Sequence, residues 1–373
     1  MFRDSGTLRN GTVSGCRVER FGEGLGFAGQ MARLQLEFDA ATDAPSSIIA
    51  KLPSPIRKNR ATLELMQGCE PEVCFFSELA SESQIPTAHC YYAAMDPDPF
   101  LENRERDRAL IERLPIWLLS FMAPLAMWLA GFSRRRYLVL IEDLGFAETG
   151  DQVDGASESV AEQAVRGLAR FHAGFRGDPR LASLYWLPSA DVMPRQLQAA
   201  FHRSTRRKRQ ELSEILNDQA WAALAWTQPR LPEIAARLSR APQTVVHGDY
   251  RLDNLLFADE RIWAIDWQTV ARGSGISDLA YFIVGSTRED VDAAAKRRLL
   301  ACYADTLAEA GVEPPPPVEL QRDYGLAKLF SLFMAVAGSD FIDLEGRGNL
   351  LLERMWSRLL VRIPEPPWDP LLA

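Results

Sequence analysis

The chain has few cysteines and none at close spacing. Its five cysteines are an odd number and contain no C-x-x-C motif: Cys16, Cys69, Cys74, Cys90 and Cys302. A disulfide framework needs paired cysteines, and cysteine-rich zinc sites use closely spaced ones. We therefore expect reduced, buried thiols rather than a disulfide-rich or zinc-binding protein.

An excess of basic residues and an apolar N-terminal segment are also missing. The 42 Lys and Arg residues are outnumbered by 50 Asp and Glu residues, which gives a formal charge of -8 and a pI near 5.3. General nucleic-acid binding needs a basic face. The opening MFRDSGTLRNGTVSG has no apolar segment typical of a secretory signal. We expect a cytoplasmic protein without a nucleic-acid partner.

The length and the pattern of the first third predict a small β-sheet lobe. At 373 residues the chain exceeds the usual size of one hydrophobic core, so two lobes are expected. Between residues 17 and 51 three strands are separated by turns, and MARLQLEF alternates apolar and polar residues. Residues 69–82 suit a short helix, and AHCYYAA and YLVLIEDL suit two further strands. The result is an antiparallel sheet with one helix.

Helical periodicity dominates after about residue 146. SESVAEQAVRGLARFHAGF has apolar residues at helical spacing, and Ser157 can cap the helix. Further helices are predicted at about 192–216, 217–239, 288–310, 318–337 and 349–361. The predicted fold class is α+β and two-lobed, with an N-lobe of residues 1–145 and a larger, mainly helical C-lobe of residues 146–373.

A glycine-rich segment precedes the second strand. GEGLGFAG, residues 22–29, contains G-x-G-x-x-G as Gly24, Gly26 and Gly29. A dinucleotide-binding fold needs a helix directly afterwards, whereas here the alternating strand follows, which disfavours a dinucleotide-dependent oxidoreductase. A glycine flap over nucleotide phosphates fits better, and an ordinary hairpin is the structural alternative.

Lys51 interrupts an otherwise apolar strand. A cation in that position is costly unless it is paired. The following helix offers Glu70, Glu72 and Glu78, and Glu72, beside an aromatic pair, is the favoured partner. Such a pair would hold the lysine against nucleotide phosphates, whereas a solvent-exposed lysine at a strand end is the alternative.

HGDYRLDN, residues 247–254, is the strongest chemical motif. Asp249 can accept a proton from an attacking hydroxyl, and Asn254 can ligate a metal through its amide oxygen. Asp266 follows the apolar RIWAI and would be the main metal carboxylate. Phosphoryl transfer needs this combination, because charge must be neutralised while the nucleophile is held in line. His247 is expected to order the loop through hydrogen bonds.

Together these motifs resemble a known superfamily. HGDYRLDNLLF, AIDW and GSGISDLAYF are similar to the aminoglycoside phosphotransferase and choline kinase superfamily, whose fold resembles that of protein kinases. GFAGQMARLQLEF, IIAKLPSP, EVCFFSELA, YLVLIEDL and LARFHAGF are most similar to its ecdysteroid kinase-like branch. The resemblance runs from about Gly22 to about Val284 with one interruption.

The resemblance implies ATP and Mg²⁺ as cofactors and assigns roles to individual residues. Asp249 would be the catalytic base, Asn254 and Asp266 the magnesium ligands, and Lys51 the partner of Glu72. The implied activity is transfer of the γ-phosphoryl group to the hydroxyl of a small molecule. The branch and the apolar insertion suggest a steroid- or lipid-like alcohol. The alternative is a non-catalytic nucleotide-binding or membrane-attached interaction module on the same fold.

Two further positions follow from the resemblance. Backbone groups from Glu142 to Leu144 would form the adenine-binding hinge. Asp278 would brace the catalytic loop, although it could equally cap its helix.

An apolar insertion at about residues 98–136 departs from the superfamily pattern. Residues 114–132, LPIWLLSFMAPLAMWLAGF, are uncharged and long enough for a membrane span. Their place between two strands of one lobe argues against a crossing, and Pro115 and Pro124 are expected to break the helix. Three interpretations stay open: a helix pair at a membrane interface, a homodimer contact, or a lid over an apolar substrate. The basic flanks favour a membrane or partner contact.

A second basic cluster lies in the predicted helical lobe. It contains Arg203, Arg206, Arg207, Lys208 and Arg209. A solvated helix face is favoured over a site for an anionic substrate.

Overall fold

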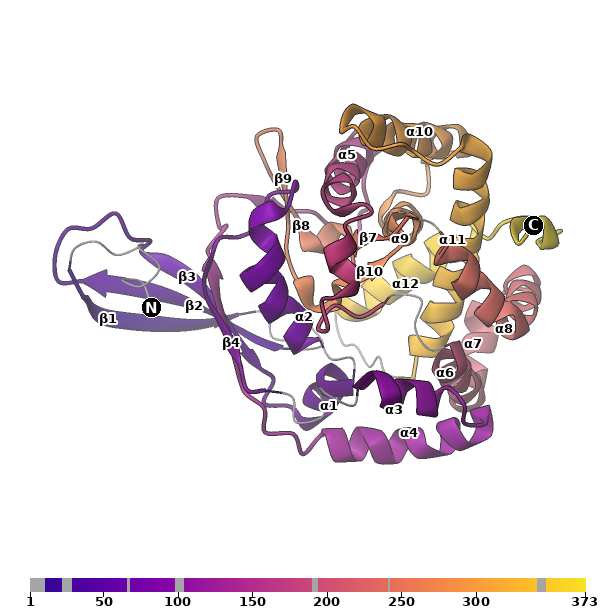
Figure 1. Ribbon diagram of the computed structural model, residues 1–373, viewed down its shortest axis with the longest axis horizontal. Helices are drawn as coiled ribbons and strands as arrows, with labels where there is room; N and C mark the ends of the chain where they lie inside the picture. Colours follow the sequence, from indigo (N-terminus) through magenta and orange to yellow (C-terminus); the bar gives the residue numbers. More distant parts are fainter. Residues whose placement is uncertain are drawn as a thin grey trace.

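The computed structural model describes residues 11–21, 29–65, 68–97, 104–189, 194–240, 242–340 and 347–373. Its N-terminal part is an antiparallel five-stranded sheet in the order β1-β2-β3-β5-β4, seen on the left of Figure 1. The strands are β1 (Val13–Phe21), β2 (Gly29–Phe38), β3 (Ser47–Pro53), β4 (Cys90–Met95) and β5 (Tyr137–Glu142). The predicted strands are all present.

One helical segment of this lobe agrees with the prediction, and another was missed. The predicted helix at 69–82 begins as α2 (Cys69–Cys74), continues as a π-helical turn (Phe75–Leu79) and ends as a 3₁₀ turn (Ala80–Glu82). α1 (Arg57–Leu65) was not predicted, because its sequence RKNRATLEL is largely polar and buries only Ala61 and Leu63.

The rest of the chain is mainly helical, as expected. Ser157 caps the first of these helices by accepting a hydrogen bond from the Val160 amide at 3.4 Å. The segment 192–216 forms two helices, which break at Lys208. The helices are α5 (Glu158–Phe175), α6 (Pro194–Arg207), α7 (Arg209–Ile215), α8 (Asp218–Leu238), α9 (Gly275–Ser286), α10 (Ala293–Glu309), α11 (Pro317–Gly338) and α12 (Arg347–Leu360). The α+β class of the prediction is confirmed.

Short strands within the helical part carry the loops of interest. β7 (Thr244–Val246) pairs with β10 (Ala271–Gly273), and a second small sheet has the order β6-β8-β9. Its strands are β6 (Glu148–Thr149), β8 (Leu255–Ala258) and β9 (Arg261–Ala264). β8 and β9 form a hairpin that separates Asn254 from Asp266 along the chain.

The apolar insertion forms α3 (Arg104–Ile111) and α4 (Ile116–Ala130). Pro115 is the N-cap of α4, but Pro124 lies inside an unbroken helix, so the expected break at Pro124 is wrong. A proline in a helix interior costs about 3 kcal/mol, which the packing of α4 against α1 and α6 offsets. Figure 1 shows α4 along the lower edge of the molecule. Among the described residues, no helix combines the length and apolar character needed to cross a bilayer.

Candidate active site

Lys51 lies at the centre of a buried charged cluster. It sits on β3 between Met31 of β2 and Val139 of β5, and its side chain is only 9% exposed. Its Nζ donates to Glu72 Oε1 at 2.5 Å and to Asp266 Oδ1 at 3.1 Å. The structure thus places Lys51 beside the favoured glutamate and not in solvent.

The two carboxylates determine the charge state of this lysine. Burial by itself lowers the pKa of the Lys51 ammonium, but the negative charges of Asp266 and Glu72 outweigh that effect and hold the pKa above its usual value. Lys51 is therefore a permanent cation at neutral pH. It joins the N-terminal sheet to a residue that is 215 positions away in the sequence.

The loop that follows β7 depends on one glycine. Gly248 has φ +81°, and a Cβ at this position would come within 2.3 Å of the Thr269 carbonyl oxygen. Only glycine satisfies both constraints. The Thr269 hydroxyl also donates to the His247 carbonyl at 2.9 Å. The HGD motif is therefore packed directly against the segment that follows Asp266.

Asp278, in the first turn of α9, holds the same loop. Its carboxylate accepts hydrogen bonds from the backbone amides of His247 at 2.6 Å and Gly248 at 2.9 Å. It also lies 3.3 Å from Nε2 of His172, whose Nδ1 lies 2.8 Å from the Tyr303 hydroxyl. Burial alone would raise the pKa of Asp278, but the contact with His172 and the other donors keep it below its usual value.

His247 connects the HGD loop to the Asp266 segment. It is fully buried, its Nε2 lies 3.0 Å from the Ile265 carbonyl oxygen, and its Nδ1 lies 3.3 Å from the amide of Asp249. Both ring nitrogens are thus engaged within the loop region, as expected of a residue that orders the loop.

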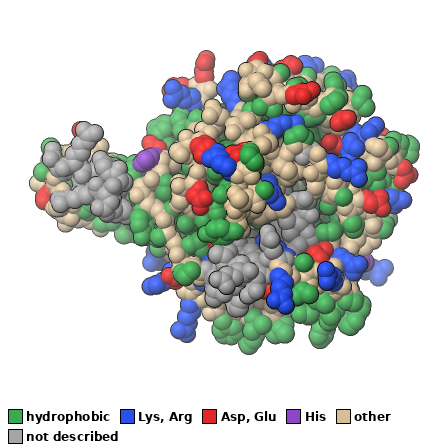
Figure 2. Space-filling model, viewed as in Figure 1, with side chains coloured by type: hydrophobic (Ala, Val, Ile, Leu, Met, Phe, Trp, Pro, Cys, Tyr) green, Lys and Arg blue, Asp and Glu red, His purple; other side chains and the backbone are tan. Residues whose placement is uncertain are grey.

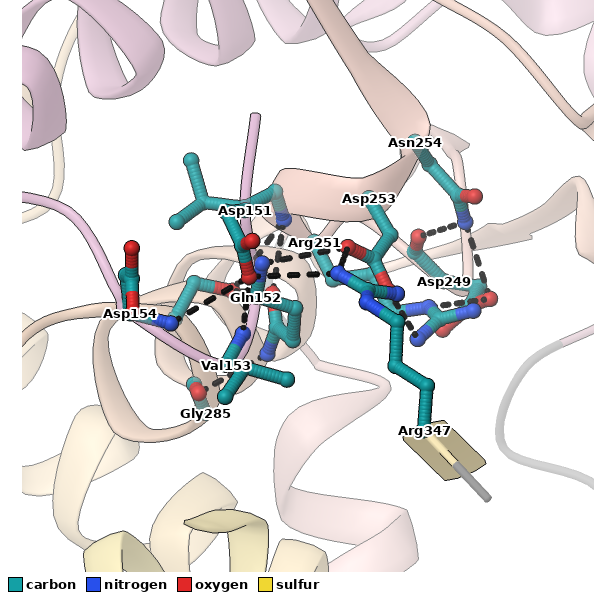
Figure 3. Close-up of polar contacts among 12 residues, drawn as sticks. Asp151, Gln152, Val153, Asp154, Asp249, Arg251, Asp253, Asn254, Gly285 and Arg347 are labelled. Carbon is teal, nitrogen blue, oxygen red and sulfur yellow. Dashed lines mark hydrogen bonds and ion pairs between the residues drawn. The ribbon is translucent and has the colours of Figure 1, made fainter. Parts of the chain in front are cut away.

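The Asp249 carboxylate is held by three neighbouring side chains. Oδ1 accepts from the Tyr281 hydroxyl at 2.9 Å, and Oδ2 accepts from Arg251 Nε at 3.1 Å and from Asn254 Nδ2 at 2.9 Å. The side chain remains 27% exposed, so a ligand can reach it. Figure 3 shows Arg251 and Asn254 converging on this carboxylate.

Asn254 and Asp266 are brought together by the β8–β9 hairpin. Leu255 pairs with Ala264, and the Ile265 amide donates to the Asn254 carbonyl at 3.0 Å. The Asn254 amide nitrogen bonds to Asp249, so its amide oxygen is the group left to act as a ligand. Carboxylate and amide oxygens are both ligand types that a hard divalent cation prefers.

Asp266 has a strained backbone. Its φ of 67° and ψ of 67° are left-handed, a conformation that non-glycine residues rarely adopt. The next residue, Trp267, is fully buried and stacks on Phe75 of the π-helical turn, with ring centroids 3.9 Å apart. Trp267 therefore fixes the segment beside the helix that carries Glu72, while the Asp266 side chain stays 39% exposed.

The remaining predicted positions contribute less to this cluster. The Glu142 amide donates to the His89 carbonyl at 2.8 Å, so this N–H is already engaged, and the Leu144 carbonyl accepts from Ala147 at 2.9 Å. Gly24 and Gly26 lie outside the described residues. Gly29 begins β2, where a Cβ would come within 2.7 Å of the Tyr137 hydroxyl oxygen.

Two residues that contact the HGD loop were not predicted from the sequence. Tyr281 lies three residues after Asp278 on α9, and this spacing places both on one helix face. The spacing could have indicated that Tyr281 also contributes to the site. Arg347, at the start of α12, bridges Asp253 of the HGD loop at 3.2 Å and Asp151 at 3.1 Å. Figure 3 shows this arginine reaching the loop from the C-terminal part of the chain.

A two-lobed kinase-like fold with a Lys–Glu pair and an HGD loop defines a site of the phosphotransferase type. Residues 118–341, more than half of the chain, match the APH family, described as the phosphotransferase enzyme family, and the chain belongs to this family. The matched segment contains the HGD loop, Asp266 and Asp278, whereas Lys51 and Glu72 precede it. The predicted phosphotransferase class and superfamily are confirmed.

Solved structures of low sequence identity share this fold. A choline kinase from Cryptosporidium parvum is 10% identical, with 93% of this chain and 88% of that chain covered and a TM-score of 0.53. An ethanolamine kinase from Plasmodium vivax is also 10% identical, with 93% and 83% covered and a TM-score of 0.50. An amicoumacin kinase in complex with AMP-PNP, Ca²⁺ and Ami is 11% identical, with 99% and 94% covered and a TM-score of 0.50. No curated protein sequence matches the chain.

Replacing Asp278 by Ala is expected to destabilise the fold by about 3 kcal/mol at pH 7, because two backbone amides lose a buried charged acceptor. An Asp in an unfolded chain has a pKa of about 3.9. Since the folded pKa of Asp278 is lower, its contribution is present above about pH 4 and is lost as the pH falls through the folded pKa. Urea unfolding between acid and neutral pH measures this contribution, with Asp259→Asn on the β8–β9 turn as the control. Equal stability of Asp278→Ala and wild type at pH 7 would contradict the bracing role.

Proposed function

We propose that this protein is an ATP- and Mg²⁺-dependent small-molecule kinase that transfers the γ-phosphoryl group to a substrate hydroxyl. The observation that carries the proposal is the double contact of Lys51 with Glu72 and Asp266, beside a loop that exposes Asp249. A cation for phosphates, oxygen ligands for a metal and a reachable carboxylate are the groups that phosphoryl transfer requires. Residues 1–145 and 146–373 act as the two lobes around the nucleotide.

Asp249 acts as the catalytic base. It accepts the proton of the acceptor hydroxyl as that oxygen attacks the γ-phosphorus, and Tyr281 and Arg251 fix the carboxylate in place. Lys51, held by Glu72, binds nucleotide phosphates. Asn254 and Asp266 hold Mg²⁺, which when bound neutralises phosphate charge. Gly24, Gly26 and Gly29 cover the phosphates, and backbone groups at Glu142 and Leu144 contact the adenine.

The acceptor we propose is an apolar alcohol of the steroid or lipid type. Support comes from the N-terminal similarity to the ecdysteroid kinase-like branch. Two proteins of the same fold are a choline kinase and an ethanolamine kinase, so amino alcohols belong in the acceptor screen beside apolar ones. We place the protein in the cytoplasm, with residues 114–132 as a contact to a membrane or to a second copy.

The decisive experiment pairs nucleotide binding with an acceptor screen. Thermal unfolding should shift upward with ATP and Mg²⁺ together, and ADP release should rise with one class among steroidal, lipidic and amino alcohols and aminoglycosides. Stabilisation by ATP without turnover on any of these compounds would favour the non-catalytic nucleotide-binding module. The absence of any nucleotide effect would reject both functions.

A further inference from the structure

We propose that the outer face of α4 and the arginines at its two ends form a docking surface for anionic lipid bilayers. We define the α4 face by its exposed side chains, which are Trp117, Phe121, Leu125, Trp128, Leu129 and Phe132. Trp117 is 70% exposed and Phe121 is 78% exposed. This surface is distinct from the phosphotransferase site and does not depend on its chemistry.

The spacing of these residues makes the face continuous. Positions 117, 121, 125, 128 and 132 recur every three or four residues, which aligns them along one side of a helix. The opposite side holds the buried Leu119, and at the edge of the face the Ser120 hydroxyl donates to the Ala199 carbonyl of α6 at 3.1 Å. α4 is thus apolar on the side that packs against the protein and apolar again on the side that faces outward. A contiguous exposed apolar patch of this kind is typical of an interaction site.

The first end of the α4 face opens into a groove with cationic walls. Trp117 and Phe121 line this groove together with Arg206 of α6 and Arg209 at the start of α7. Both arginines are exposed, and within the described ranges neither has an ion-pair or hydrogen-bond partner for its guanidinium. Neighbouring arginines differ, because Arg207 pairs with Asp340 at 3.3 Å.

The second end is also basic. The Arg57 guanidinium lies over the Phe132 ring, 3.6 Å from its centroid, and the exposed Arg134 follows two residues later. In the part of the chain that the structure describes, Arg134 has no side-chain partner. Figure 2 shows hydrophobic side chains along the lower edge of the molecule, where Figure 1 places α4, with Lys and Arg side chains nearby.

Aromatic side chains between unpaired cations are complementary to an anionic bilayer. Trp and Phe enter the boundary between head groups and acyl chains, while the arginines remain at the level of the lipid phosphates. A second copy is less suited, because a two-fold contact sets the same patch against itself and would bring the same arginines together. Since α4 is too short to cross a bilayer, it would lie in the plane of the interface.

Flotation with vesicles tests this proposal on the full-length protein. Wild type should bind vesicles of phosphatidylcholine with phosphatidylglycerol more strongly than vesicles of phosphatidylcholine alone, and added salt should weaken the difference. Arg206→Gln with Arg209→Gln should lower partition onto the anionic vesicles by about 30-fold. Trp117→Ser with Phe121→Ser should lower partition onto both vesicle types by more than about tenfold.

Two control pairs distinguish loss of this docking surface from a general effect of removing exposed charges or apolar side chains. Arg261→Gln with Arg297→Gln removes two exposed charges elsewhere, and Val318→Ser with Val361→Ser removes two exposed apolar side chains elsewhere. Both control pairs should bind vesicles like wild type, and all variants should keep the thermal shift with ATP and Mg²⁺.

Three results would overturn the proposal. They are no binding of wild type to either vesicle type, an equal loss in the control pairs, or a stable dimer in light scattering that Trp117→Ser with Phe121→Ser dissociates without any vesicle binding. None of them depends on kinase activity, so the lipid surface can fail while the proposed function stands.

Discussion

Asp249→Ala is expected to reduce phosphoryl transfer to the acceptor by about 10³-fold or more, the upper part of the range for loss of a general base. Asp253, the other carboxylate of the same loop, cannot replace Asp249 easily, because it is engaged by Arg347 and by the Gln152 backbone amide. ATP affinity should change by less than about threefold, since the residues proposed to bind the phosphates are intact. Single-turnover product formation measures the first quantity, and a thermal-shift titration with ATP measures the second.

Tyr281→Phe is the matched control for this experiment. It removes one hydrogen bond to Asp249 and leaves the carboxylate in place. A single hydrogen bond of this type contributes about 0.5–1.5 kcal/mol, so we expect a loss of about tenfold or less. If Asp249→Ala retained the activity of Tyr281→Phe, Asp249 would not be the base.

The sheet and most helices could be predicted because their signals are local. Strand β2 alternates apolar and polar residues over eight positions, and Ser157 precedes an amphipathic helix that it caps. α1 was missed because a helix that buries two residues has almost no apolar periodicity. The prediction of a break at Pro124 was wrong for a related reason. The local cost of this proline is offset by packing against distant elements, which cannot be seen in the neighbouring sequence.

Site residues with a local sequence signal could be predicted, whereas a residue that contacts only distant parts of the chain could not. Lys51 stood out as a cation in an apolar strand, and Asp266 as a carboxylate after an apolar run, so both could be identified from their neighbours. Arg347 could not be identified, because its partners Asp151 and Asp253 lie 196 and 94 residues away and the contact has no local pattern. Ion pairs at such separations arise only when the fold brings distant elements together.

The left-handed backbone conformation of Asp266 was also not predicted, and it helps to explain why the carboxylate lies beside Lys51. A left-handed residue two positions after β9 turns the chain sharply, and its carboxylate reaches Lys51. Backbone strain of this kind persists where the surrounding structure enforces it, here through the buried Trp267 and the two hydrogen bonds of Ile265.

Asp266→Ala and Asp266→Asn are expected to lose phosphoryl transfer by more than about 10²-fold, because both remove a carboxylate proposed to hold Mg²⁺ beside the phosphates. Their stabilities should differ. Asn tolerates the left-handed conformation, whereas Ala adds a cost of about 1 kcal/mol there, so only Asp266→Ala should combine lost activity with this backbone penalty in urea unfolding. Mg²⁺ should also no longer tighten ATP binding in Asp266→Ala, whereas Asp266→Asn keeps an amide oxygen and should lose only part of this effect; titrations of ATP with and without Mg²⁺ measure the difference. Wild-type Mg²⁺ dependence in Asp266→Ala, which has no side-chain oxygen at this position, would show that the metal is held elsewhere.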